Sequence, residues 1–252
     1  MKKIIYILLI GASLLLAGCK EQAKEQPTIR FAAAASLEKM FEQKLLPLYK
    51  EQNPKHKLQG TYAGSGKLQI QIEQGMQADV FISASTKQLQ ALQAKGLVQT
   101  SKPLLKNELV LIVPAKGKST IRTFKDFAQA KQPAIGDYKT VPAGQYAKEA
   151  LEKLGLWQTV AHRVSLGSNV VEVLHWVAQG SADAGLVYAT DAASNSQVKV
   201  VAAVPKTLLT DSIIYPLIVL KSNNQSPHVQ SFVEFLQSKE AQAIYQEYGF
   251  GH

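Results

Sequence analysis

The chain has 252 residues, of which 46% are hydrophobic and 19% are charged. These values are typical of a folded protein with one large core or two smaller ones, and they exclude a disordered or collagen-like chain.

The formal net charge of +9 raises the question of a nucleic-acid partner. The lysines are spread along the chain and do not alternate with aromatic residues, which argues against nucleic acid. Plain solubility, or attraction to anionic surfaces or small anions, is the alternative.

The first 18 residues have the pattern of a secretory signal peptide. Two lysines precede an apolar run at residues 4–16, which fits the ~7 to 15 residues of a signal core and is shorter than the ~20 that span a bilayer. The run ends in LAGC at Cys19, the only cysteine, which cannot form an internal disulfide. LAGC resembles the lipobox of bacterial lipoproteins, in which the cysteine is acylated. We therefore predict an exported protein that is lipid-anchored through Cys19 to the outer face of the bacterial cell membrane, with residues 19–27 as a polar tether.

From residue 28 onward, short apolar runs alternate with segments of helical periodicity. Strands are expected at residues 29–35, 58–62, 79–82, 107–114 and 212–221. Helices are expected after each of the first two, and Pro47 is expected to end or kink the first helix. This alternation predicts an α/β protein with parallel-rich sheets flanked by helices.

Two of these strands, at residues 107–114 and 212–221, are long, apolar and far apart in the sequence. A further series of strands and helices lies between them. We expect the two strands to cross between two lobes, with the C-terminal helices returning to the first. The predicted first lobe comprises residues 28–111 and 212–252, and the second comprises residues 112–211.

Residues 60–68 read GTYAGSGKL and invite comparison with a phosphate-binding loop. A Walker A loop fails because Thr61 stands at its first glycine and a leucine follows the lysine. A nucleophile elbow fails because Ala63 occupies its first glycine position. What remains is Ser65 between two glycines, after a strand and before a helix. Free amide hydrogens and the helix dipole favour an anion at such a place, and a simple helix cap is the alternative.

Three other segments place polar or small residues at predicted helix starts. Ser36 follows the first strand, and residues 141–144 (VPAG) open a helix. Residues 168–172 (SNVVE) open another, with Asn169 as the expected cap and Glu172 as its partner in a capping box. The four helix starts could converge on one cleft.

The sequence contains no recognisable catalytic arrangement. The five histidines, at positions 56, 162, 175, 228 and 252, have no metal-ligand spacing. A serine nucleophile is also not indicated, because the nucleophile-elbow motif does not match. We therefore expect neither an enzyme nor a cofactor or metal centre.

Six segments carry a family resemblance that extends from about Ile29 to the C-terminus. They are AAAASL, YAGSGKLQIQIEQGMQADVFISA, GDYKTVPAGQYAKEALEKLG, SNVVEVL, GLVYATDA and YGFGH. In this order they resemble the molybdate-binding proteins of bacterial ABC importers. The resemblance implies the two-lobed type II fold of periplasmic binding proteins, with the ligand cleft between the lobes. It also implies a monomer that delivers its ligand to an ABC permease and its ATPase.

The same resemblance implies a set of ligand-binding residues. Ser36 and Ser65 match serines that donate hydrogen bonds from the first lobe. Ala143 and Val170 match positions that donate through backbone amides, and Tyr188 matches a tyrosine whose hydroxyl reaches the ligand. Without the family, Val170 would be interpreted as a core residue and Tyr188 as a buried aromatic residue.

These five positions offer hydrogen-bond donors without charge. An unprotonated tetrahedral dianion presents only acceptors, so hydroxyls and amides suit it, whereas a phosphate that keeps a proton also needs an acceptor. The three arginines lie outside these motifs, which argues against a carboxylate ligand. Sulfate has the same chemistry as molybdate and stays the alternative. The resemblance favours molybdate, and the nearly isosteric tungstate is expected to bind as well.

Overall fold

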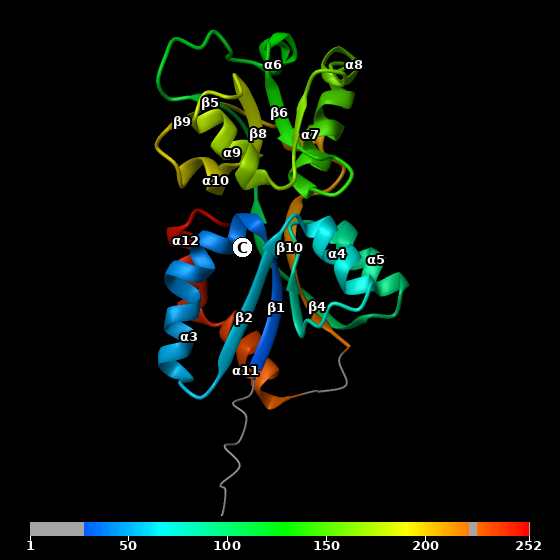
Figure 1. Ribbon diagram of the computed structural model, residues 1–252, viewed down its shortest axis with the longest axis vertical. Coiled ribbons are helices and arrows are strands. Elements are labelled where there is room, and N and C mark those ends of the chain that lie inside the picture. The colour runs from blue at the N-terminus through cyan, green and yellow to red at the C-terminus, as the bar shows by residue number, and fades with distance from the viewer. Residues whose placement is uncertain (1–27, 222–225, 252) are drawn as a thin grey trace, which may run out of the picture.

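The computed structural model describes residues 28–221 and 226–251, and the predicted signal peptide, Cys19 and the tether lie outside them. Two lobes lie one above the other, each built on its own sheet, and strands near the middle of the molecule connect them (Figure 1). Among the residues described, no helix is long and apolar enough to cross a membrane.

The first lobe contains a five-stranded sheet in the order β2-β1-β3-β10-β4. Its strands are β1 (Thr28–Ala34), β2 (Lys57–Ala63), β3 (Val80–Ile82), β4 (Val98–Asn107) and β10 (Ile213–Leu220). Its helices are η2 (Ala35–Leu37), α2 (Glu38–Met40), η3 (Phe41–Leu45), α3 (Leu46–Gln52), α4 (Ser65–Glu73), α5 (Thr86–Ala94), α11 (Pro227–Phe235) and α12 (Lys239–Glu247).

The second lobe contains a five-stranded sheet in the order β7-β6-β8-β5-β9. Its strands are β5 (Leu109–Pro114), β6 (Pro133–Gly136), β7 (Ser165–Gly167), β8 (Ala184–Tyr188) and β9 (Val198–Ala203). Its helices are α6 (Phe124–Gln129), α7 (Pro142–Lys153), α8 (Trp157–Val160), α9 (Val170–Ala178) and α10 (Ala189–Ala193), and the turn η4 (Lys206–Leu208) leads back towards the first lobe.

In each sheet, four strands run in one direction and one runs against them. The reversed strands are β10 and β5, which pair antiparallel with both of their neighbours, whereas β1 and β6 pair parallel with theirs. The prediction of parallel-rich sheets is therefore confirmed. The reversed strands are the two long apolar strands expected to cross between the lobes.

The first crossing lies at Glu108. Asn107 still pairs with Ile213 in the first sheet, and Leu109 already pairs with Tyr188 in the second. All of β5 belongs to the second sheet, so the predicted boundary after residue 111 falls inside a strand. The apolar run alone could not locate the crossing, because β5 is buried on both sides wherever it pairs.

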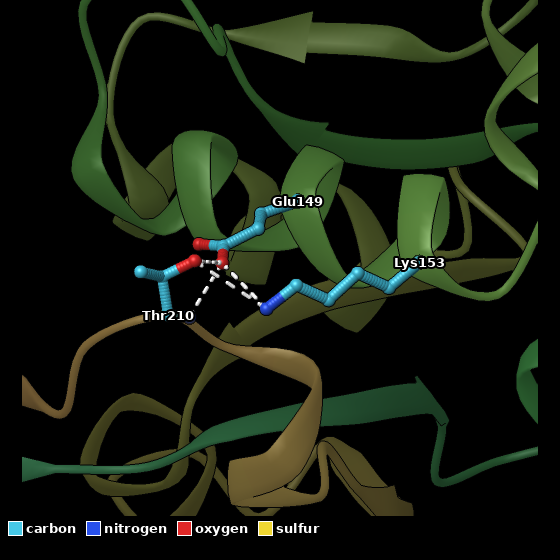
Figure 2. A network of polar contacts seen from close by, with 3 residues as sticks. All are labelled: Glu149, Lys153 and Thr210. Atoms are coloured by element: carbon cyan, nitrogen blue, oxygen red, sulfur yellow. Dashed lines mark hydrogen bonds and ion pairs between the residues drawn. The ribbon is translucent and has the colours of Figure 1, made fainter.

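The second crossing, between β9 and β10, is attached to helix α7. The Glu149 carboxylate accepts hydrogen bonds from the backbone N–H of Thr210 at 2.5 Å and from its hydroxyl at 2.6 Å (Figure 2). Lys153, one turn further along α7, approaches the same carboxylate at 3.1 Å. This network ties the connecting segment to the helix whose first turn contains Ala143.

Side chains alternate between the two faces of the first sheet, as strand geometry requires. Phe31 packs against Phe41 and Phe232 on one face, whereas the adjacent Ala32 contacts the apolar cluster that contains Leu68 of α4 on the other. Pro47 does not end the first helix. The chain makes a π-helical turn at η3 and continues as α3, with proline in the first turn, where its missing N–H is tolerated.

Candidate functional site

A small cavity of about 10 Å³ lies where the two lobes meet, and all five predicted site residues line it. They are Ser36, Ser65, Ala143, Val170 and Tyr188. The described residues around it carry no formal charge; besides these five they are Asn169, Gly64 and small apolar side chains. A volume of this size corresponds to about one water-sized sphere, smaller than a tetrahedral oxyanion, so the lobes must part slightly to hold one.

Ser65 is the first residue of α4 and is 1% exposed. Its hydroxyl oxygen accepts a hydrogen bond from the backbone N–H of Ala84 at 3.0 Å. The cap position of α4 is occupied by Gly64, so the alternative that Ser65 is a simple helix cap does not hold. Because the oxygen accepts from Ala84, the hydroxyl proton is left to donate, and the cavity lies beside it.

Ser36 lies in the short 3₁₀ turn η2 that follows β1. Its hydroxyl lies 3.0 Å from that of Tyr215, a fully buried residue of β10. Sequence reasoning did not identify Tyr215, because strand β10 is apolar and a tyrosine in it indicates only core packing.

Two helices of the second lobe direct their first turns at the cavity. Ala143 follows Pro142 in the first turn of α7. Val170 is the first residue of α9, and Asn169 caps that helix by accepting from the N–H of Glu172 at 3.0 Å, as predicted. Amides in the first turn of a helix have no acceptor within the helix, so both positions can donate to a ligand.

The predicted capping box at α9 is displaced by one residue. The Glu172 carboxylate accepts from the N–H of Ser168 at 2.6 Å and from its hydroxyl at 2.8 Å, and not from the N–H of Asn169. Asn169 keeps the extended backbone of a cap, with φ −158° and ψ 171°.

Tyr188 ends β8 and is 1% exposed. Its hydroxyl is buried and has no hydrogen-bond partner among the described residues. Burial raises the pKa of Tyr188 well above its ordinary value, so the phenol keeps its proton and remains a donor at neutral pH. An orphaned buried hydroxyl is costly, and a ligand that accepts from it would relieve that cost.

The glycines around Ser65 let the second lobe approach closely. The N–H of Gly66 donates to the carbonyl of Thr140 in the second lobe at 2.8 Å, and a Cβ added at Gly66 would lie 2.4 Å from that carbonyl oxygen. A Cβ at Gly64 would lie 2.8 Å from the carbonyl oxygen of Ser168. In this structure the motif therefore brings the two lobes together around the cavity, a role beyond the close approach to an anion expected from the sequence.

Asp191 was also missed by sequence reasoning. It lies in α10, is 5% exposed, and its Oδ2 has no hydrogen-bond partner in the described residues. Burial raises the pKa of Asp191 to about 8, although a hydrogen bond from the Tyr188 backbone opposes the shift. The carboxyl is therefore largely neutral at pH 7 and adds little negative charge behind Tyr188.

Ionisation of Asp191 should weaken the binding of a dianion. A bound dianion disfavours the charged carboxylate and raises its pKa further, so affinity should be level below pH 8 and fall as the pH rises through about 8. Calorimetric titrations across this range, with the dianion expected from the sequence, measure the effect. Asp191→Asn should give a flat profile, and an equal slope in that variant would contradict the assignment.

Val170→Pro tests the backbone donor at α9. Proline is tolerated at the first helical position, and the extended conformation of Asn169 suits a residue that precedes proline. The helix should form with one donor fewer, and affinity should fall by roughly tenfold or more, since about 1.4 kcal/mol corresponds to one decade. Val170→Ala keeps the amide and should bind nearly as the wild type does. Equal affinities, with melting curves that show both variants folded, would remove this amide from the site.

The family model for bacterial extracellular solute-binding proteins matches residues 29–251. The chain belongs to this family. Among its relatives, YvgL of Bacillus subtilis, a candidate ABC transporter substrate-binding lipoprotein, is 36% identical over 98% of this chain and 96% of YvgL. The molybdate-binding protein ModA of Haemophilus influenzae is 36% identical over 96% of each chain.

A solved structure of a solute-binding domain agrees with this assignment. The substrate-binding domain of a candidate molybdenum ABC transporter from Clostridium difficile is 38% identical, with a TM-score of 0.67 over 89% of this chain and 98% of that one. The two-lobed periplasmic binding protein fold expected from the sequence is confirmed.

Proposed function

We propose that the protein binds molybdate, and with it tungstate, in the cavity between its lobes. The observation that carries this proposal is the set of uncharged donors around one small cavity, with the buried Tyr188 hydroxyl lacking a protein partner. Hydroxyls of Ser36 and Ser65 and amides of Ala143 and Val170 complete the set. The name of one relative, the molybdate-binding protein ModA of Haemophilus influenzae, supports the choice of ligand.

The donors suit a dianion without any neutralising cation. Each ligand oxygen offers only lone pairs, and a hydrogen bond to a charged group contributes about 1.5 to 3 kcal/mol, roughly twice the value for neutral partners. The N-termini of α4, α7 and α9 add their positive dipole ends. A carboxylate near the ligand would oppose binding, and Asp191, the buried acid behind Tyr188, is largely neutral at pH 7.

Sulfate is the alternative, because it too is an unprotonated tetrahedral dianion. A ligand panel separates the candidates: melting temperature and calorimetry with molybdate, tungstate, sulfate, phosphate and citrate. A ligand at 100 times its Kd should stabilise the protein by about 2.7 kcal/mol. We expect this response to molybdate and tungstate. A response to sulfate alone would establish the alternative, and a response to citrate alone would overturn the oxyanion site.

The binding role is that of a substrate-binding component of an ABC importer. We propose that the protein acts as a monomer, delivers the oxyanion to a permease with its ATPase, and is not an enzyme. Membership of a solute-binding family and the ABC transporter relatives support this role.

We further propose that Cys19 is acylated and anchors the protein to the outer face of the membrane. The LAGC sequence and the lipoprotein name of one relative support the anchor. Cys19→Ala should abolish incorporation of a labelled fatty acid and leave the protein uncleaved or released from the membrane. Label retained in this variant would contradict the anchor.

A further inference from the structure

We propose that Asn107 and Tyr215 fix the direction of the Ser36 hydroxyl proton, so that this serine presents a donor to the anion. The inference rests on the proposed function, because Ser36 is one of the proposed donors. Among the described residues that line the cavity, neither Asn107 nor Tyr215 is present. Both are positioning residues that act through Ser36.

The orientation of the Asn107 side-chain amide follows from its neighbours. Its Oδ1 accepts from the backbone N–H of Glu108 at 2.9 Å. A backbone N–H can only donate, so the amide oxygen must face it and the amide nitrogen must point away. The nitrogen then donates one hydrogen to Thr190 Oγ1 at 2.9 Å and the other to Tyr215 Oη at 3.3 Å.

The Tyr215 hydroxyl transmits this orientation. It has two hydrogen-bond partners among the described residues, Asn107 and Ser36. Oη accepts from Asn107, and the nearby Tyr188 hydroxyl, which interacts with Tyr215 electrostatically, forms no hydrogen bond with it. The acceptor within hydrogen-bond geometry for the proton of Oη is therefore Ser36 Oγ, 3.0 Å away. The opposite arrangement, with Ser36 donating, would leave the proton of a fully buried phenol without an acceptor, which costs about 1 to 3 kcal/mol.

Ser36 therefore accepts from Tyr215 and turns its own proton towards the cavity. Ser65 is arranged in the same way, because its oxygen accepts from the N–H of Ala84. A protonated ligand oxygen is a donor, and it would face two serine hydroxyls that also donate, so its proton would have no acceptor there. The arrangement thus selects a fully deprotonated dianion over an oxyanion that carries a proton.

Asn107 also connects the two lobes. It is the last residue of β4 in the first lobe, and its hydrogen bond to Thr190 reaches α10 in the second. The side-chain amide of Asn107 therefore contacts Tyr215 in the first lobe and Thr190, two residues beyond Tyr188, in the second.

The experiment compares Tyr215→Phe with Tyr245→Phe. Tyr245 is a matched control, because it is also buried in the first lobe and its hydroxyl donates to the Leu236 carbonyl at 2.8 Å, away from the cavity. Both variants lose a buried phenol hydrogen bond and keep the ring. Affinities for molybdate and for hydrogen phosphate are measured by calorimetric competition, together with melting curves.

In Tyr215→Phe, Ser36 can turn and accept from a protonated ligand. Molybdate affinity should fall by about twofold to tenfold, the equivalent of one hydrogen bond, while phosphate affinity holds or rises. The ratio of the two affinities should therefore fall. A variant whose first lobe is only less stable should lose affinity for both ligands by the same factor. Any effect of Tyr245→Phe is expected to be of this kind.

Asn107→Asp reverses the direction of the hydrogen-bond chain from Asn107 through Tyr215 to Ser36, which is called the relay below. A carboxylate accepts the Tyr215 proton, so Tyr215 no longer donates to Ser36 and its oxygen competes with the ligand for the Ser36 proton. The affinity for molybdate should fall by about tenfold or more in the wild-type background and by clearly less in Tyr215→Phe, where only the added charge acts.

The outcomes separate the relay from the proposed ligand. Wild-type protein that binds molybdate, with an unchanged affinity ratio in Tyr215→Phe, would overturn the relay and leave the proposed function standing. Wild-type protein that binds sulfate and not molybdate would overturn the ligand, and the relay would then be tested with sulfate against phosphate. Binding of neither dianion would overturn both.

Discussion

Replacing Gly66 by alanine should reduce the affinity for molybdate by about 100-fold or more, which corresponds to two lost hydrogen bonds to a charged ligand. The added Cβ would lie 2.4 Å from the Thr140 carbonyl oxygen, and backbone atoms cannot give way as a flexible side chain can. The lobes would close incompletely. Donors from the second lobe, at Ala143, Val170 and Tyr188, would then no longer reach a ligand held by the first.

This variant separates closure from folding. The clash arises between residues of different lobes, so each lobe can still fold. Alanine also favours a helix over glycine by about 1 kcal/mol, so the melting temperature without ligand should not fall. Lys67→Ala is the control, because Lys67 is the adjacent exposed residue of α4. Calorimetry measures the affinity, and small-angle scattering with ligand measures closure. Wild-type affinity in Gly66→Ala would show that the contact with Thr140 is dispensable.

Replacing Gly144 by alanine should lower the stability of the protein by about 3 kcal/mol or more, at the upper end of the range for overpacking. A Cβ at Gly144 would lie 1.9 Å from the Gly136 carbonyl oxygen and 2.5 Å from its carbonyl carbon. Both residues belong to the second lobe, so α7 cannot move away without leaving β6. The first turn of α7, with Ala143, would be displaced as well.

Gly155→Ala provides the comparison for this second variant. Gly155 has a φ of +69°, and no atom lies within 4 Å of an added Cβ, so its cost comes from the backbone alone, about 1 to 2 kcal/mol. Denaturant unfolding measures both. A loss in Gly144→Ala no larger than that in Gly155→Ala would contradict the steric account of how α7 docks on β6.

Local patterns predicted most of the fold. The strands at β1, β2, β3, β5 and β10 were recognised because they are apolar and bounded by helical periodicity. Strands β6, β7, β8 and β9 were expected only as part of a further series without assigned bounds, and strand β4 was not predicted. Most of its residues are at least partly exposed, and it carries Pro103. It lies at the sheet edge beside β10, where a proline is tolerated, with one further bridge from Lys106 to Gly251.

Four predicted helix starts have signatures short enough to be read from the sequence, and the structure gathers them around one cavity. What local patterns could not supply are contacts between distant segments. The Tyr215 hydroxyl contacts Ser36 from a strand that otherwise looks like core, and the role of Gly66 depends on a carbonyl in the other lobe. Likewise, the raised pKa of Asp191 comes from burial. The sequence around Asp191 gives no sign that this residue is buried.

The most direct test of the central claim is a crystal of the protein grown with molybdate, measured at the molybdenum absorption edge. The proposed function predicts one strong anomalous peak in the cavity, with ligand oxygens within hydrogen-bond distance of the Ser36, Ser65 and Tyr188 hydroxyls and of the Ala143 and Val170 amides. A peak elsewhere, or no peak with saturating molybdate, would contradict it.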